Sequence, residues 1–259
     1  MKKTIFLTLI ALICIFSLSV TSFANSPEMH WSCKRCGNAQ PPITAAETMV
    51  TEYGGYSIDR GVDDTSERKV LYLTFDLGYE NGNTAKILDT LREEGVSAAF
   101  FILDNIVLRN ADLVTRMDSE GHLVCNHTKD HKNVCRMTPG EIAENLGALE
   151  ALCLEKTGVR MAKYFRFPEG RYSEAAIKVI NDLGYKSIFW SFAYADWDNK
   201  RQPAPEKAIK KVLDNTHNGA VILLHPTSAT NSEILPTLIK EWRAQGYTFG
   251  TLDDLTTAK

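Results

Sequence analysis

Short apolar segments of this chain end repeatedly at side chains that can transfer protons or bind metals. Asp76 follows the segment Val70–Phe75, and His225 follows Ala220–Leu224. Three further segments lead to His127, to Arg166 and, after a short gap, to Asp196. In α/β barrels the loops after the strands build the active site, so residues at the carboxyl ends of several strands converge on one face. The pattern therefore predicts an enzyme with a hydrolytic site of aspartate and histidine side chains.

From residue 69 onward, strand-like and helix-like segments alternate. The segment 83–94 carries its apolar residues on one face, and the segment 138–157 begins with Thr138, Pro139 and Glu141, which are signals for a helix start. The predicted strands are 70–75, 97–103, 122–126, 163–166, 186–192, 220–224 and 247–251. The other predicted helices are 105–118, 173–183, 205–215 and 233–245. About seven strands that alternate with helices are typical of parallel βα units and predict the α/β class.

The first residues have the pattern of an export signal. Lys2 and Lys3 precede an apolar run over residues 5–20, and Ser22-Phe23-Ala24 resembles a signal-peptidase site. We expect residues 1–24 to be a signal peptide that is cut after Ala24, with an uncleaved amino-terminal anchor as the alternative. Removal of the two lysines changes the formal charge from -3 to -5. The protein is therefore expected to work outside the cytoplasmic membrane.

The remainder divides into two predicted parts. Residues 25–65 show no sustained period and contain the turn Gly54-Gly55, so they are predicted to form an irregular extension. Residues 66–258 are predicted to form one catalytic domain. The formal charge of -3 gives no sign of a nucleic-acid partner, and no obligate protein partner is indicated.

Five cysteines lie outside the predicted signal segment. They are Cys33, Cys36, Cys125, Cys135 and Cys153. Export permits disulfides, but an odd number leaves at least one thiol unpaired within a monomer. The motif Cys33-x-x-Cys36 could be half of a zinc site or a redox pair, although we expect a simple disulfide or an incidental role, because no second cysteine or histidine pair lies nearby.

Asp76 and Arg166 are candidates for a base and its partner. A carboxylate at a strand end can act as a general base on water, although an aspartate there also commonly caps a turn. Arg166 could clamp a carboxylate and keep it ionised, or it could be an ordinary surface arginine. Gly170 would let the backbone approach a ligand closely.

His127 and His131 are candidates for metal ligands. Residues four apart face the same side of a helical turn, which is a common way to hold zinc or a similar ion, although both rings could simply be solvated. His122 and His225 also lie at predicted strand ends. Protonated His225 could donate to a leaving amine, and Asp196 could orient that ring and raise its pKa, although a lone histidine in an apolar run is often a core residue.

Taken together, these motifs resemble the polysaccharide deacetylases with the NodB homology domain, also called carbohydrate esterase family 4. The family pattern is TFDD, H-[ST]-x-x-H, R-x-P-x-G, an Asp–Trp segment and L-x-H. It is similar to Thr74–Asp76, His127–His131, Arg166–Gly170, Asp196-Trp197 and Leu223–His225, over about residues 69–254. The resemblance implies a distorted (β/α)7-type barrel that acts as a carbohydrate N-deacetylase.

Other segments are similar to the PdaA-like branch of the family. These are Asp76–Gly82, Phe189–Ser191, Gly246–Phe249 and the leader His30–Ser32. The branch implies removal of acetyl groups from N-acetylmuramic acid in peptidoglycan glycan strands, on the way to muramic δ-lactam in the spore cortex. The expected compartment is the cell wall or spore cortex. A deacetylase of N-acetylglucosamine polymers is the alternative that keeps the chemistry.

The resemblance also implies roles for individual residues. Asp76 would be the base, Arg166 its tether, His225 the acid and Asp196 the residue that tunes His225. A divalent metal, zinc or similar, would be held by His127 and His131. The implied substrate-binding residues are Tyr79, Glu80, Pro168, Gly170, Tyr172 and Trp197.

Leu77 departs from the family pattern. It stands where the family has a second aspartate that binds the metal, and leucine cannot be a ligand. Because catalytic zinc usually has three protein ligands, the metal is expected to be weakly bound, altered or absent. Substitute ligands could come from Glu80, Asp130, Cys125 or Cys135. Leu77 also keeps open a metal-deficient, non-catalytic glycan-binding homologue.

Overall fold

The computed structural model describes residues 26–257 and has a curled parallel sheet at its centre. Its strands follow the order β7-β5-β4-β3-β2-β9-β8, and β10 pairs with the start of β2. Their bounds are β2 (Val70–Leu77), β3 (Ala99–Ile102), β4 (Leu123–Asn126), β5 (Ala162–Phe165), β7 (Lys186–Ser187), β8 (Phe192–Ala193), β9 (Ala220–Leu224) and β10 (Thr248–Phe249). The predicted α/β class and distorted barrel are confirmed.

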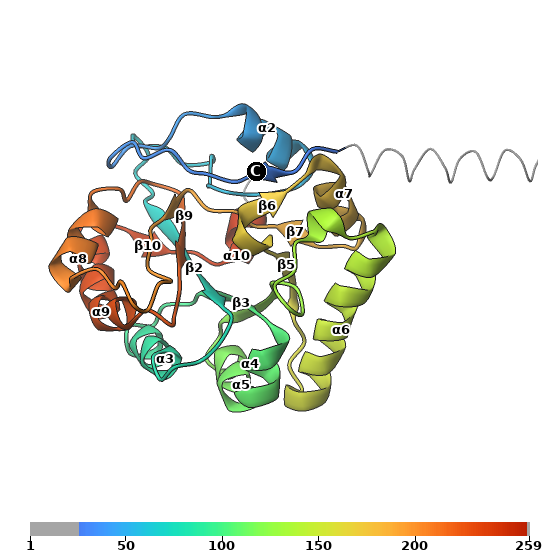
Figure 1. Ribbon diagram of the computed structural model, residues 1–259. Helices are drawn as coiled ribbons and strands as arrows, with labels where there is room; N and C mark the ends of the chain where they lie inside the picture. The colour runs from blue at the N-terminus through green and yellow to red at the C-terminus, as the bar shows by residue number, and fades with distance from the viewer. Residues whose placement is uncertain (1–25, 258–259) are drawn as a thin grey trace, which may run out of the picture.

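Helices surround the curled sheet, as Figure 1 shows in a view into the barrel. The large apolar core lies between the sheet and these helices and includes Trp242 and Leu88. The helices are α3 (Thr84–Glu93), α4 (Asp104–Arg109), α5 (Ala111–Ser119), α6 (Pro139–Thr157), α7 (Glu174–Asp182), α8 (Pro205–Leu213), α9 (Ala229–Ala244) and α10 (Leu252–Thr257). As predicted, α6 begins with a capping box between Thr138 and Glu141.

All eight residues of the central strand β2 are buried, as expected of a strand covered on both faces. Leu73, Phe75 and Leu77 belong to the core against the helices. Thr74 and Asp76 alternate with them and reach Arg166 in the interior of the barrel. The two-residue period of the strand therefore sends Asp76 and Leu77 to opposite faces of the sheet.

The segment 186–192 was predicted as one strand, and this prediction is wrong. It forms β7 and β8, which lie at opposite edges of the sheet. Between them, the amide of Phe189 donates to Tyr56 O at 2.7 Å, and the amide of Ser191 donates to Val221 O at 3.0 Å. The backbone thus crosses the gap of the barrel on partners that are distant in sequence. The predicted helix 105–118 is also divided, because Asn110 leaves helical geometry at φ -139° and ψ 45°.

The predicted extension closes the barrel. It contains β1 (Met29–His30) and α2 (Ala45–Glu52), neither of which was predicted. Beyond α2, the amide of Tyr56 donates to Ser187 O at 2.8 Å, and the amide of Asp59 donates to Gly219 O at 2.9 Å. This stretch links the edge at β7 with the start of β9. The predicted boundary at residue 65 therefore separates segments that are hydrogen-bonded into one unit.

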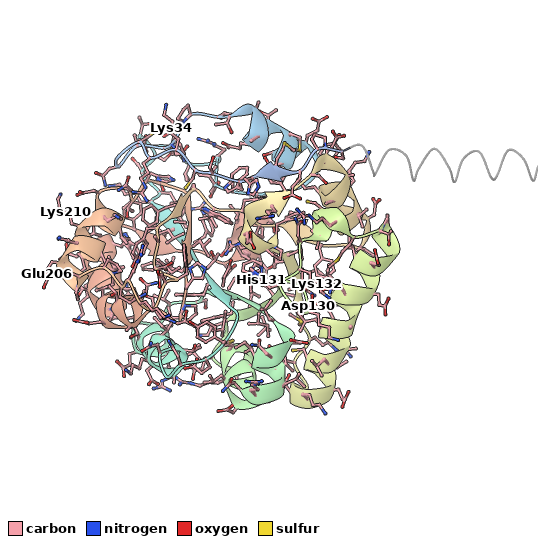
Figure 2. All side chains as sticks on the ribbon, viewed as in Figure 1. Lys34, Asp130, His131, Lys132, Glu206 and Lys210 are labelled. Carbon is pink, nitrogen blue, oxygen red and sulfur yellow. The ribbon has the colours of Figure 1, made fainter. Side chains whose placement is uncertain are left out.

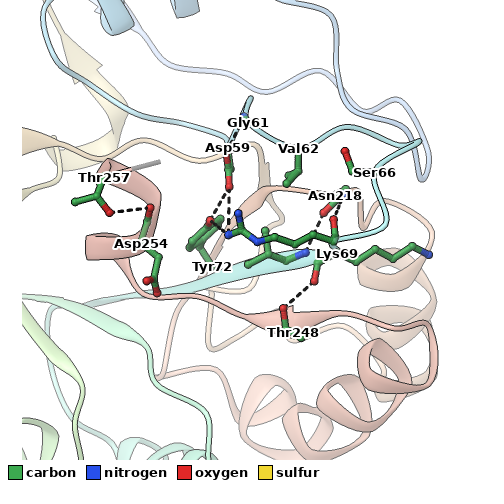
Figure 3. A network of polar contacts seen from close by, with 12 residues as sticks. Asp59, Gly61, Val62, Ser66, Lys69, Tyr72, Asn218, Thr248, Asp254 and Thr257 are labelled. Carbon is green, nitrogen blue, oxygen red and sulfur yellow. Dashed lines mark hydrogen bonds and ion pairs between the residues drawn. The ribbon is translucent and has the colours of Figure 1, made fainter. Parts of the chain in front are cut away.

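A buried polar network fixes the extension to the base of the barrel (Figure 3). Asp59 accepts a hydrogen bond from the hydroxyl of Tyr72 at 2.7 Å. The amide of Asn218 donates to Asp63 O and Arg68 O, both at 2.8 Å, and its oxygen accepts from the amide of Val70 at 2.9 Å. The bond to Val70 satisfies a backbone amide that would otherwise be buried without a partner.

A second contact joins the start of the described chain to the segment that follows β5. Strand β1 pairs antiparallel with β6 (Arg171–Tyr172), which follows the short helix η2 (Pro168–Gly170). The predicted signal peptide, residues 1–24, lies outside the described residues, as does residue 258 at the end of the predicted catalytic domain. Within residues 26–257, no helix combines the length and apolarity needed to cross a membrane.

Candidate active site

A cavity of about 830 Å³ opens at the carboxyl ends of the strands. Asp76 enters it from the end of β2, and His225 enters it directly after β9. His127 and His131 enter it from the loop after β4. Arg166 and Asp196 are completely buried and lie behind these side chains. The six residues predicted for catalysis and metal binding therefore meet at one end of the barrel.

Arg166 holds Asp76 from within the barrel. Its Nη1 donates to Asp76 Oδ1 at 2.8 Å and to Thr74 Oγ1 at 2.9 Å. Its Nε donates to Ile188 O at 3.0 Å, and its Nη2 donates to Phe189 O at 3.3 Å. With bonds from three of its nitrogens, the guanidinium group has one orientation, which fixes the carboxylate in place.

The charges around Asp76 keep it ionised. Burial alone would raise its pKa, but the positive charge of Arg166, followed by the influence of His127 and His225, lowers the pKa below the ordinary value. Oδ1 is engaged with Arg166, whereas Oδ2 lies 3.6 Å from His127 Nε2. An ionised carboxylate with one oxygen left for a ligand can accept a proton from water.

His225 is paired with a buried carboxylate. Its Nδ1 lies 2.7 Å from Asp196 Oδ1, and its backbone amide donates to Asp196 Oδ2 at 2.8 Å. Burial alone would lower the pKa of His225, but the negative charge of Asp196 and this hydrogen bond raise it. Because Nδ1 faces Asp196, Nε2 remains as the ring nitrogen that can deliver a proton into the cavity.

His127 and His131 lie together, with ring centroids 4.9 Å apart. The predicted helical turn is wrong, because the residues form a loop in which Thr128 and His131 have left-handed φ angles of 69° and 58°. His127 Nδ1 donates to Arg166 O at 2.9 Å, which leaves a lone pair on Nε2. Burial lowers the pKa of His127 to about 4, so the ring is neutral and able to bind a metal. In Figure 2, His131 lies near the middle of the view, beside Asp130 and Lys132.

These donors fit only part of a metal shell. Leu77 is completely buried against the helices, so no carboxylate joins the two imidazoles from that position. Of the predicted substitutes, Asp130 pairs with Lys132 at 2.6 Å, and Cys125 lies in an apolar core. Cys135 packs against another core, and Glu80 Oε1 accepts from the amide of Thr84 at the start of α3. Within residues 26–257, no group of three or more histidine, cysteine or acidic residues could hold a metal ion.

The six residues predicted to bind substrate fall into two groups. Tyr79, Gly170 and Trp197 line the cavity, and both aromatic rings are exposed. The other three are not among the lining residues. Glu80 accepts hydrogen bonds from the amides of Gly82 and Thr84. Pro168 is buried, and Tyr172 packs its ring against Phe189.

Several residues around the cavity were not predicted as site residues. Trp190, Tyr194 and Glu169 line it, and the first two belong to the aromatic-rich segment Trp190–Trp197. Glu169 has a left-handed φ of 56°, which no sequence signal indicates. Asn231 donates to Asp196 Oδ2 at 2.6 Å, but it was missed because α9 begins at Ala229, ahead of the predicted start at residue 233.

Two further features of the sequence lie away from the cavity. His122 precedes β4, at the opposite end of the sheet, where its Nδ1 accepts from the amide of Ala98 at 3.2 Å. The five cysteines of the described chain are all free thiols: Cys33, Cys36, Cys125, Cys135 and Cys153. Of the two expectations for Cys33 and Cys36, the simple disulfide therefore finds no support in the structure, and an incidental role stays a prediction.

Comparisons with known proteins agree with this geometry. The Polysaccharide deacetylase family profile matches residues 63–188. The peptidoglycan-N-acetylmuramic acid deacetylase PdaA of Bacillus subtilis is 35% identical over 233 residues, which cover 89% of this chain and 86% of that protein. The solved structure of B. subtilis PdaA, a family 4 carbohydrate esterase, has a TM-score of 0.82 at 34% identity and covers 88% of this chain and 96% of that one.

More distant relatives differ in what is known of them. The peptidoglycan-N-acetylglucosamine deacetylase PgdA of Listeria monocytogenes is 31% identical over 194 residues, which are 75% of this chain and 40% of that protein. A family 4 pseudoenzyme from Bacillus anthracis has a TM-score of 0.68 at 26% identity and covers 74% of this chain and 67% of that one. The fold therefore occurs in both active and inactive proteins.

Proposed function

The chain belongs to the polysaccharide deacetylase family, carbohydrate esterase family 4, and from this premise we propose that it removes N-acetyl groups from peptidoglycan sugars. The main support is one pair of opposite protonation states in a single cavity. Arg166 keeps Asp76 ionised, and Asp196 favours the protonated form of His225. Amide hydrolysis requires a base and an acid. A carboxylate that is kept ionised can be the base, and an imidazolium that is kept protonated can be the acid.

The proposed reaction uses these two groups in sequence. Asp76 Oδ2 accepts a proton from a water molecule while the water oxygen bonds to the acetyl carbon. His225 Nε2 then donates its proton to the amide nitrogen, and the bond between carbon and nitrogen breaks. The products are acetate and a free amino sugar. Arg166 keeps the base in place, and Asp196 stabilises the charged ring of the acid.

Deacetylases of this family are generally metal-dependent. In this chain, His127 and His131 would hold a divalent metal, zinc or similar, and such an ion would polarise the acetyl oxygen. Because Leu77 supplies no ligand, we propose that the ion is bound weakly and that water or substrate completes its shell. The neutral state of His127, which results from its burial, supports this role.

For the substrate we propose N-acetylmuramic acid in peptidoglycan strands, as a step toward the muramic δ-lactam of spore cortex. The similarity to PdaA over most of both chains supports this choice. Exposed Tyr79 and Trp197 would stack on sugar rings at the mouth of the cavity. We further propose that residues 1–24 direct export to the cell wall or spore cortex, and that 66–258 form the catalytic domain, closed by the extension.

Two other functions have specific support. The relationship to PgdA supports deacetylation of N-acetylglucosamine residues by the same chemistry. The position of Leu77, together with the likeness to a family pseudoenzyme, supports a glycan-binding protein without activity. The buried pairs of Asp76 with Arg166 and of Asp196 with His225 favour the enzyme, because a binding protein has no need for a matched base and acid.

Mass spectrometry of muropeptides distinguishes these functions. Peptidoglycan fragments with and without stem peptides would be incubated with the protein, each with and without added zinc. Loss of one acetyl group from muramic acid supports the proposal, and loss from glucosamine supports the first alternative. Fragments that bind the protein but keep every acetyl group, with and without zinc, would contradict the proposed reaction.

A further inference from the structure

Asn231 connects the Asp196–His225 pair to the first turn of α9. Its Nδ2 donates to Asp196 Oδ2 at 2.6 Å and to His225 O at 3.1 Å. Its Oδ1 accepts from the hydroxyl of Tyr194, so a flipped amide would lose this bond and place an oxygen against the carboxylate. The side chain is 1% exposed. Asn231 therefore has one favourable orientation, in which it donates to Asp196.

Few groups stabilise the negative charge of the Asp196 carboxylate. It is completely buried, and its only ion-pair partner within the described residues is His225. Its Oδ2 accepts two hydrogen bonds, from the backbone amide of His225 and from Asn231. When His225 gives up its Nε2 proton, the attraction between the two charges is lost, and the buried anion keeps these two hydrogen bonds together with the one from Nδ1–H of the neutral ring.

We propose that Asn231 is a positioning residue that stabilises the Asp196 carboxylate after His225 has released its proton. A histidine paired with a buried carboxylate would otherwise hold its proton too tightly to be an effective acid. The effect on catalysis in this inference rests on the proposed function. The hydrogen bonds themselves do not depend on which sugar is bound.

Other groups also act on His225 and are kept in both variants, although the hydroxyl of Tyr194 loses its acceptor, Asn231 Oδ1. Asp76 favours the protonated ring and Arg166 opposes it, both across the cavity. Tyr194 lies beside Asp196, and burial raises its pKa well above the ordinary value. Gln202 holds the backbone of the same loop, because its Nε2 donates to Asp196 O at 2.7 Å and to Asp198 O at 3.0 Å. Asn231 thus supplies the side-chain donor, and Gln202 supports the main chain.

The test is an NMR titration of His225 in the full chain, with Asn231→Leu and Asn231→Ala. Leucine fills the space so that water cannot replace the lost donor, and alanine is the smaller second variant. We expect the pKa of His225 to rise by about one unit in the leucine variant, because the deprotonated pair loses more stabilisation than the protonated one. We expect kcat to fall about tenfold with KM unchanged, and the basic limb of the pH profile to move to higher pH.

Asn83→Ala is the matched control, since Asn83 is also buried but its amide donates to Thr227 O and Asn81 Oδ1, which carry no charge. It should lower the melting temperature without moving the titration of His225. An unchanged titration of His225 in folded Asn231→Leu or Asn231→Ala would overturn the inference. Because the titration needs no substrate, it gives this answer even if the wild-type protein releases no acetate.

Discussion

A half-buried histidine, His225, and a buried one, His122, show how the surroundings of a residue affect its charge. Asp196 lies against His225 and raises the pKa of that ring despite burial. His122 has no such partner: burial, the largest influence, lowers its pKa from 6.5 to about 4. Its Nε2 also has no hydrogen-bond partner within the described residues. The surroundings of the same side chain thus favour its charged form at one end of the barrel and its neutral form at the other.

The low pKa of His122 predicts a specific loss of stability in acid. Between about pH 6.5 and pH 4 the unfolded chain binds a proton at this residue that the folded chain does not, so the free energy of unfolding falls as pH falls. The slope from one proton is at most about 1.4 kcal/mol per pH unit. Urea unfolding of wild type and His122→Gln across this range should give a flatter curve for the variant. Parallel curves would contradict the assignment of a neutral, buried ring.

Residue types at strand ends were predictable because parallel strands bring their carboxyl ends together, which is why Asp76 and His225 were found from sequence. The geometry of His131 was not predictable, because its left-handed backbone arises from the loop and not from local propensity. Asn231 was also out of reach, since its role depends on Asp196, 35 positions away in the chain. The orientation of Leu77 toward the helices follows from strand alternation, but only once the strand is known to extend to that residue.

Elements with strong local signals were predicted well. Helix α6 has its capping box and α3 its apolar stripe, and both lie within a residue or two of their predicted bounds. The prediction was poor for β7, β8 and the extension. Their course is determined by long-range backbone hydrogen bonds and not by a local apolar period.

Gly219 is where the extension meets the start of β9. It has a φ of 74°, and a Cβ there would lie 2.3 Å from Asp59 O, closer than real contacts allow. Gly184 has a similar φ of 82° but no atom within 4 Å of an added Cβ. We therefore expect Gly184→Ala to cost about 1 kcal/mol of unfolding free energy and Gly219→Ala clearly more, at least about 2 kcal/mol. Urea unfolding measures the free energy of both variants. Equal costs would show that the extension does not limit the space at Gly219.

At the scale of the whole molecule, the barrel is incomplete without residues 26–65. The extension bonds to the backbone at Ser187 and Gly219 and buries Val50 and Val62 in the cores. A chain that begins at residue 66 would expose the edge at β7 and both of these apolar surfaces. We expect that chain to aggregate or lack a cooperative melting transition, whereas residues 26–259 should melt cooperatively. A cooperative transition in the shorter chain would show that the catalytic domain folds alone.

The proposed mechanism depends on one carboxylate, at the carboxyl end of the central strand, acting as a base. Asn in place of Asp76 keeps an oxygen for the hydrogen bond from Arg166 but removes the proton acceptor. Arg166 also keeps its bonds to Ile188 O and Phe189 O, so the variant should fold. Circular dichroism and thermal melting of Asp76→Asn would verify this.

The most direct test compares acetate release from peptidoglycan fragments by wild type and Asp76→Asn under identical metal supply. A general base of this kind contributes about 10²- to 10⁴-fold, so release by the folded variant should fall at least about 100-fold. Undiminished release by the folded variant would contradict the assignment of Asp76 and, with it, the proposed mechanism.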